Sequence, residues 1–150
     1  MNPFDPKAAL LAKHAQHVVL IHFPIAMLLT GVAFDIAAQW TRRQALAAAA
    51  YYNLLVAAAA TVPTVATGLL AWQLQLGGAR LKGVLLQHLV LGIVSAVLIG
   101  CCWWLHFRAR RDNPDGPLPA YRWPVELAAA AVVALTGHLG GFLSGVNAPG

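Results

Sequence analysis

Long apolar segments alternate with short polar ones along the whole chain. Apolar runs long enough to cross a bilayer as a helix, about 20 residues each, occupy residues 18–38, 45–72, 84–106 and 125–146. Polar stretches separate them near residues 41–44, 73–83 and 108–124, and the last contains the turn-rich sequence DNPDGPLP. The pattern therefore predicts four transmembrane helices in a single membrane domain, with no room for a second domain.

Short connections make consecutive helices antiparallel neighbours, so the expected fold is all-α, an integral membrane four-helix bundle of up-down-up-down topology. The tryptophans support these boundaries, because each lies within a few residues of a predicted helix end, where aromatic rings meet the lipid headgroups: Trp40, Trp72, Trp103, Trp104 and Trp123. The first residues hold only a short apolar patch, which is not typical of a cleavable signal. We expect the first long run to remain as a membrane anchor.

Composition favours the same class of protein. Hydrophobic residues make up 59% of the chain and charged residues only 10%, whereas soluble domains average about 25% charged. The net charge of +5 comes from short hydrophilic gaps and forms no basic stripe, so nucleic-acid binding is not expected. The two cysteines, Cys101 and Cys102, are adjacent and form no CxxC motif, which gives no support to zinc-finger, iron–sulfur or covalent haem sites.

The charges also predict an orientation. An even number of spans places both termini and the 73–83 loop on one face, here called the N-terminal face, and the other two loops on the arginine-rich face. The arginine-rich face carries Arg42, Arg43, Arg108, Arg110, Arg111 and Arg122, and the N-terminal face carries Lys7, Lys13, Arg80 and Lys82. By the positive-inside rule the arginine-rich face is cytoplasmic, so the termini are expected in the periplasm or outside the cell.

Five of the six histidines converge on the N-terminal face. His14 and His17 lie at its surface, and His22, His88 and His138, from three different helices, lie roughly 6–12 Å below it. Ionisable residues at this depth are costly and mark functional sites, although a neutral imidazole also serves as a hydrogen bond between helices. Glycines on the face of His138, such as Gly141, fit either close helix packing or space for a flat cofactor. Only His106 lies toward the other face.

The residue types near these histidines favour haem. Zinc and copper sites often include Cys, Asp or Glu, but Asp35 and Glu126 lie near the arginine-rich face, where pairing with Arg42, Arg43 or Arg122 is expected and a proton path is the other interpretation. Haem needs only one or two axial imidazoles and an apolar slot. We predict axial ligands from His22, His88 and His138, with Arg80 or Lys82 at the propionates and His17 serving a propionate, a second haem or a quinone.

The chain also resembles a known family. The sequence HVVLIHFPIAMLL, the later Asp35 and His88, and the segment TGHLGG match the pattern of the bacterial four-helix membrane proteins filed as domain of unknown function 2231. Matching residues are His17, His22, Phe23, Pro24, Asp35, His88, His138, Gly140 and Gly141, and the chain departs from the pattern at Val18, where proline is frequent. Members are often fused to, or encoded beside, cytochrome c, Rieske or periplasmic dehydrogenase modules, so the resemblance implies a redox role in the bacterial inner membrane.

The leading hypothesis is therefore a small cytochrome b-like subunit in the lipid bilayer. It would hold one or two non-covalent b-type haems and pass electrons between a periplasmic cytochrome c or dehydrogenase and quinone or another cytochrome, within a larger complex. This role is electron transfer rather than enzymatic catalysis. Two alternatives stay open: a copper- or zinc-handling protein that uses His22, His88 and His138 as metal ligands, and a structural anchor subunit without a cofactor.

Overall fold

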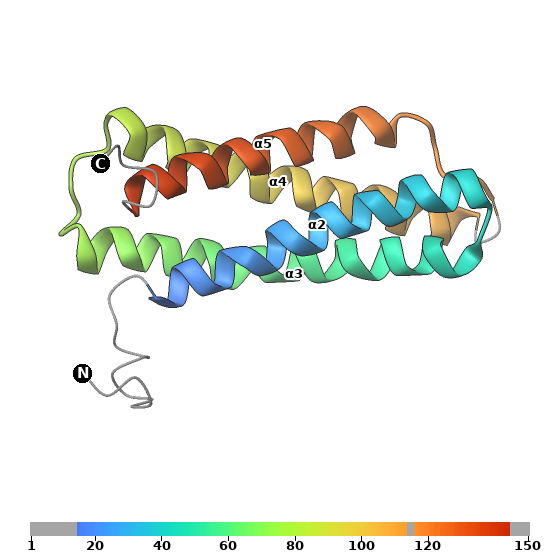
Figure 1. Ribbon diagram of the computed structural model, residues 1–150, viewed down its shortest axis with the longest axis horizontal. Helices are drawn as coiled ribbons and strands as arrows, with labels where there is room; N and C mark the ends of the chain where they lie inside the picture. The colour runs from blue at the N-terminus through green and yellow to red at the C-terminus, as the bar shows by residue number, and fades with distance from the viewer. Residues whose placement is uncertain (1–14, 114–115, 145–150) are drawn as a thin grey trace.

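The computed structural model describes residues 15–113 and 116–144. This part of the chain forms four helices, α2 (Ala15–Thr41), α3 (Gln44–Gln75), α4 (Gly83–Asp112) and α5 (Arg122–Leu143), and contains no strand. Figure 1 shows the four helices side by side, each running opposite to the one before it. The predicted all-α, up-down-up-down membrane bundle is confirmed.

The helices extend beyond the apolar runs that predicted them. Helix α4 continues from residue 106, where its prediction ended, to Asp112. The added turns are charged, and Arg110 is held there because its Nη2 donates to the Ala47 carbonyl oxygen at 2.6 Å and its guanidinium lies over the Tyr51 ring. An apolar pattern therefore marks the hydrocarbon-spanning part of a helix and misses the part that enters the headgroups. The predicted end of the fourth helix, residue 146, lies outside the described residues.

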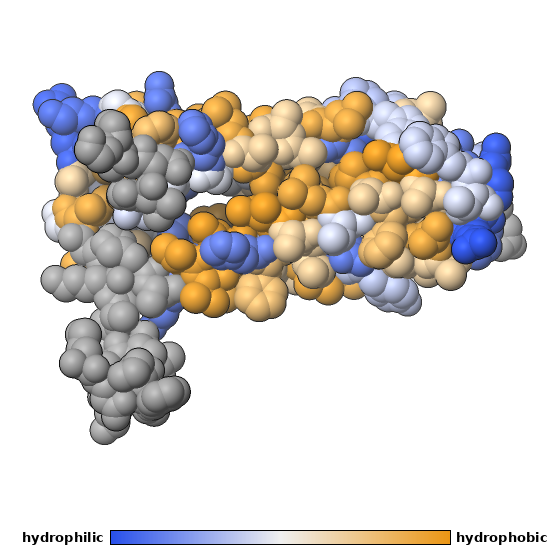
Figure 2. All heavy atoms as spheres, viewed as in Figure 1, coloured by the Kyte–Doolittle hydropathy of each residue, from blue (hydrophilic) through white to orange (hydrophobic). Residues whose placement is uncertain are grey.

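All four helices are long and apolar enough to cross a membrane. The shortest, α5, has 22 residues, which corresponds to about 33 Å, against about 30 Å of hydrocarbon in a typical bilayer. Large apolar side chains in the middle of the helices point away from the bundle, with Val62 71% and Val97 60% exposed. Orange apolar residues accordingly dominate the middle of the surface in Figure 2. Such a surface fits contact with lipid, and the chain is a membrane protein.

The core is built from small and branched apolar residues of all four helices, which are Leu28, Val32, Leu54, Ala57, Ile99, Cys102, Ala129 and Val133. Helices α2 and α3 approach closely at Gly31, where an added Cβ would lie 3.1 Å from two side-chain atoms of Leu54. Glycine allows this approach because it has no side chain. The bundle is thus organised as an α2/α3 pair and an α4/α5 pair, joined through contacts of α3 with α4 and α2 with α5.

The connections are short and sharply turned. At the arginine-rich face only two residues separate α2 from α3, and Arg42 adopts a left-handed conformation with φ of 58°. At the N-terminal face Gly77 and Gly78 have positive φ, and the Trp72 Nε1 donates to the Ala79 carbonyl oxygen at 2.9 Å. This bond fixes the chain immediately before Arg80.

The two helix pairs separate toward the N-terminal face. Figure 2 shows an opening between the α4/α5 pair and the α2/α3 pair at the end of the molecule where α2 begins. Toward the opposite end the same view shows closely packed spheres across the pairs. The bundle is therefore closed at the arginine-rich end and open at the end that carries most of the histidines.

Close packing at Gly31 predicts a difference between two Gly→Ala variants. Both gain the same helix propensity, but Gly31→Ala forces a methyl group against buried Leu54, whereas a Cβ at Gly100 meets nothing within 4 Å. We expect Gly31→Ala to be less stable than Gly100→Ala by about 1–3 kcal/mol, measured by denaturant unfolding in detergent micelles. Equal stability of the two variants would contradict the close α2/α3 contact.

Candidate functional site

Two histidines at the N-terminal face have their ring orientation set by the backbone. The His22 Nδ1 donates to the Val18 carbonyl oxygen at 2.6 Å, within α2. The His88 Nδ1 donates to the Thr136 carbonyl oxygen at 3.1 Å, across from α4 to α5. Because Nδ1 carries the proton in both rings, the neutral imidazole presents the Nε2 lone pair, which is the arrangement of most metal-ligating histidines.

Glycines on neighbouring helices make room for two of the imidazole rings. A Cβ on Gly140 of α5 would lie 3.1 Å from the His88 Cε1, and a Cβ on Gly68 of α3 would lie 2.9 Å from the His17 Cε1. The His17 Nδ1 also forms a hydrogen bond with the Thr67 Oγ1 at 3.3 Å. Each glycine therefore leaves space for a histidine ring of the neighbouring helix, because a side chain at that position would contact the ring.

Two other predicted residues of this face, His138 and Arg80, are exposed. His138 lies on the outside of α5, with its ring edge-on to Phe142 at a centroid distance of 5.0 Å, and Arg80 is exposed in the α3–α4 connection. His14 lies outside the described residues. Within the described ranges, no three of the predicted histidines form a group with ligand atoms close enough to share one ion. Their role as haem or metal ligands stays a prediction.

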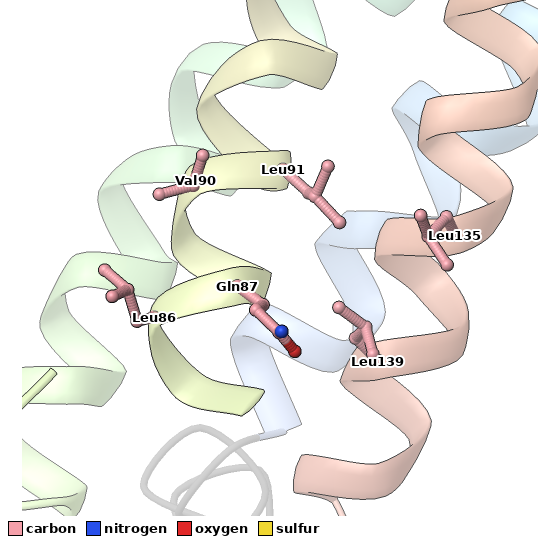
Figure 3. Close-up of a pocket in the computed structure, with 6 residues that line it drawn as sticks. All are labelled: Leu86, Gln87, Val90, Leu91, Leu135 and Leu139. Carbon is pink, nitrogen blue, oxygen red and sulfur yellow. The ribbon is translucent and has the colours of Figure 1, made fainter. Parts of the chain in front are cut away.

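An apolar groove runs beside this site between α4 and α5. It has a volume of about 560 Å³, and it is lined by Leu86, Gln87, Val90, Leu91, Leu135 and Leu139. Figure 3 shows Gln87, Leu91, Leu135 and Leu139 between the two helices, with Gln87 as the polar side chain among them. Its apolar lining, on a bundle surrounded by hydrocarbon, fits a lipid chain better than a polar ligand.

A second cluster lies at the arginine-rich end, in the closed half of the bundle. The Arg122 Nε donates to the Asp35 Oδ2 at 2.7 Å, and the His106 Nε2 bonds the Glu126 Oε1 at 2.7 Å. The four side chains come from α2, α4 and α5, and each is at most 2% exposed. Among the described residues, Asp35, His106 and Glu126 are the one group of three potential ligand side chains whose atoms lie within 4.8 Å of one another.

The two pairs of this cluster differ in how fully they are hydrogen bonded. Arg122 makes further bonds from Nη1 to the carbonyl oxygens of Leu118 and Pro119, at 3.3 and 3.2 Å. In contrast, the His106 Nδ1 and the Glu126 Oε2 are buried without a hydrogen-bond partner. The Arg122–Asp35 pair is thus anchored to the loop, whereas the His106–Glu126 pair has an open position at each end.

The expected pairing of the two carboxylates is confirmed for one of them. Asp35 binds Arg122, as the sequence predicted among three arginines. Glu126 binds His106 instead of an arginine. Sequence reasoning missed this partner because His106 was the single histidine toward the arginine-rich face and was therefore not grouped with other residues. Its depth could have revealed the partner, since His106, Asp35 and Glu126 all lie about one to two turns from the helix ends at that face.

Comparison with known proteins identifies the chain at the family level. A family model described as "Predicted membrane protein (DUF2231)" matches residues 13–147, nearly the whole chain. The chain belongs to the DUF2231 family. Searches among curated proteins and solved structures gave no match. The resemblance to DUF2231 carried by the HFP and GHLGG segments is confirmed, and the family is one of membrane proteins.

Removing Asp35 from the ion pair is expected to be strongly destabilising. Asp35→Asn leaves the Arg122 guanidinium buried without its counter-charge, and arginine does not lose its proton. We expect a loss of about 3–5 kcal/mol in the free energy of unfolding, measured by detergent-denaturant titration.

The matched control is Asp112→Asn, which removes a carboxylate whose pair with Arg108 is 3.6 Å long and more than half exposed on both sides. That change is expected to cost less than about 1 kcal/mol. Combining Asp35→Asn with Arg122→Gln removes the unpaired charge, so the double variant is expected to regain stability. An Asp35→Asn variant as stable as Asp112→Asn would contradict the buried pair.

Proposed function

We propose that this DUF2231 protein is a membrane electron-transfer subunit that holds a b-type haem near its N-terminal face. The observation that carries the proposal is the hydrogen bonding of His22 and His88, each of which donates Nδ1–H to a backbone carbonyl oxygen and so keeps an unprotonated Nε2. A haem bound there supplies one-electron redox chemistry, while the chain supplies ligands and a dry environment.

The hydrogen bond of His22 favours ligation over a structural role. A histidine that serves to join helices bonds a neighbouring helix, but His22 bonds Val18 of its own helix and is exposed on the bundle. His88 does join α4 to α5 through Thr136, so for this residue both roles agree with its contacts. The contacts of His22 therefore favour the haem proposal over the hypothesis of a structural anchor without a cofactor.

The shape of the bundle supports a flat ligand at this end. His22 belongs to the α2/α3 pair and His88 to the α4/α5 pair, and Figure 2 shows the opening between these pairs. Apolar helix surfaces and two neutral imidazoles suit an iron porphyrin, which needs one or two axial nitrogens and an apolar slot. Arg80, exposed beside the same end, offers a cation to the propionates.

The same geometry gives less support to a zinc or copper site. Such sites need three or four ligand atoms converging on one ion, and no three of these histidines converge within the described part of the chain. In the haem proposal, His22 and His88 would each supply one imidazole nitrogen, from different helix pairs. In the same proposal His17 serves a propionate, a second haem or a quinone.

A reduced-minus-oxidised absorption spectrum tests the proposal. Protein purified from haem-replete cells is expected to show Soret and α-band changes typical of a low-spin b-type haem. His22→Gln and His88→Gln are each expected to lower the haem-to-protein ratio by at least about tenfold, and His138→Gln is expected to keep the bands. No haem bands in the folded wild-type protein would overturn the proposal, and stoichiometric copper or zinc without porphyrin would favour the metal-handling alternative.

We further propose that the protein lies in the bacterial inner membrane with the N-terminal face in the periplasm, where a cytochrome c or dehydrogenase subunit delivers or accepts electrons. Asn113 and Ala79 lie at opposite ends of the bundle. In a chain with Cys101 and Cys102 replaced by alanine, an impermeant maleimide added to spheroplasts is expected to label Ala79→Cys and not Asn113→Cys. The reverse labelling would invert the orientation.

A further inference from the structure

The buried cluster at the arginine-rich end has no part in the haem proposal and does not depend on it. We propose that His106 and Glu126 form a two-member proton relay inside the membrane domain, with Asp35 and Arg122 as its positioning residues. The ligand of this site is the proton, exchanged with buried water molecules at the two ends of the pair.

The bonding pattern of the pair is that of a relay. A relay member needs one bond to its partner and one free atom that receives or releases a proton. The His106 Nε2 and Glu126 Oε1 are joined at 2.7 Å, and the remaining atom of each group, Nδ1 and Oε2, is buried without a partner. A pair retained only to hold helices together is expected to have these positions satisfied, as they are around Arg122.

Buried side-chain polar atoms without a hydrogen-bond partner occur in this pair and near it. In the described part of the chain, the buried side-chain atoms without a hydrogen-bond partner are the Trp103 Nε1, His106 Nδ1 and Glu126 Oε2. Trp103 precedes His106 by three residues on α4 and so lies near the same face of that helix. Buried water commonly satisfies such atoms, and water is the medium that a proton relay requires.

Charge balance identifies the proton as the ligand. The ionisable groups that face the pair are Asp35 from α2, Cys102 from α4 and Arg122 from α5. Arg122 neutralises one carboxylate, so one further proton, shared between His106 and Glu126, makes the cluster electrically neutral. A divalent cation in the same place would leave a net positive charge beside the guanidinium in a low-dielectric interior, which is unfavourable.

The transfer step is balanced as follows. The His106 Nδ1 accepts a proton from a hydronium ion on its side, which leaves water, the Nε2–H bond breaks, and that proton bonds to the Glu126 Oε1. The carboxylic acid then rotates and gives its proton to water on the Oε2 side, which becomes hydronium. Charge is conserved, because one proton enters as one leaves. Transfer in the opposite direction, in which Glu126 returns a proton to Nε2 and Nδ1 releases its own to water, restores the first arrangement.

The position of Arg122 places the relay close to the arginine-rich face. Arg122 is the first residue of α5 and is bonded to Leu118 and Pro119 in the preceding loop, and Glu126 follows one turn later. Its ion pair with Asp35 of α2 holds the start of α5 against the bundle. This anchoring keeps Glu126 against His106 while leaving the outer atoms of the pair open.

Infrared spectroscopy of the full chain in liposomes tests the relay without any cofactor. Protonated carboxyl groups in an apolar environment give a distinct C=O stretching band that shifts in D₂O. We expect one such band to change with pH in the wild-type protein, to be absent in Glu126→Gln and to be kept in Asp112→Asn. His106→Gln is expected to keep a band and to slow its hydrogen–deuterium exchange by about 100-fold.

Three other outcomes overturn the proposal. A band unaffected by Glu126→Gln places the titrating group elsewhere, and unchanged exchange in His106→Gln means that the pair is structural. A stoichiometric metal lost in Glu126→Gln would make the cluster a metal site. If Glu126→Gln fails to fold, Glu126→Asp, which keeps the carboxyl group, identifies the band by shifting it. None of these results depends on haem, so they are separable from the spectra that test the electron-transfer proposal.

Discussion

The structure depends on one constraint, which is that polar groups in the hydrocarbon must find partners inside the protein. Hydroxyl groups meet it locally, since Thr30, Thr64 and Thr67 each donate to the carbonyl oxygen four residues earlier. Charged groups cannot meet it locally, and they pair across helices, as Asp35 and Arg122 do at 2.7 Å. Because the pairing partners sit on different helices, satisfying them also fixes how those helices pack.

The same constraint explains why the two ends of the bundle differ. At the arginine-rich end, opposite charges neutralise one another, so α2, α4 and α5 can close around the four side chains of the cluster, each of which is at most 2% exposed. At the N-terminal end the spans contain histidines without carboxylates, and a neutral imidazole needs only one acceptor for its proton. His22 and His88 take backbone carbonyl oxygens for this purpose. No charge attraction draws the helix pairs together there, and Figure 2 shows them apart.

Depth in the membrane was predictable from the sequence, and rotation about the helix axis was not. Counting residues from the polar loops placed the spans and the topology correctly, and it put Asp35 near three arginines, of which Arg122 is its partner. The same count gives His106 and Glu126 similar depths, but whether two residues at one depth meet depends on which faces of their helices turn inward. Helices that are apolar all round give no sequence signal for that face. For the same reason the sequence could not predict that Gly68 and Gly140 face the rings of His17 and His88.

The acceptor of the imidazole N–H helps to distinguish a histidine that joins two helices from one that is free to bind a cofactor. His88 donates to α5 and so stabilises helix packing whether or not its Nε2 has a further role. His22 gains nothing for packing, because its proton goes to Val18 in its own helix while the ring stays exposed. An imidazole at that depth is costly compared with an apolar side chain. The bond within its own helix and the exposed ring are therefore the features that favour the proposed ligand role of His22 over a role in helix packing.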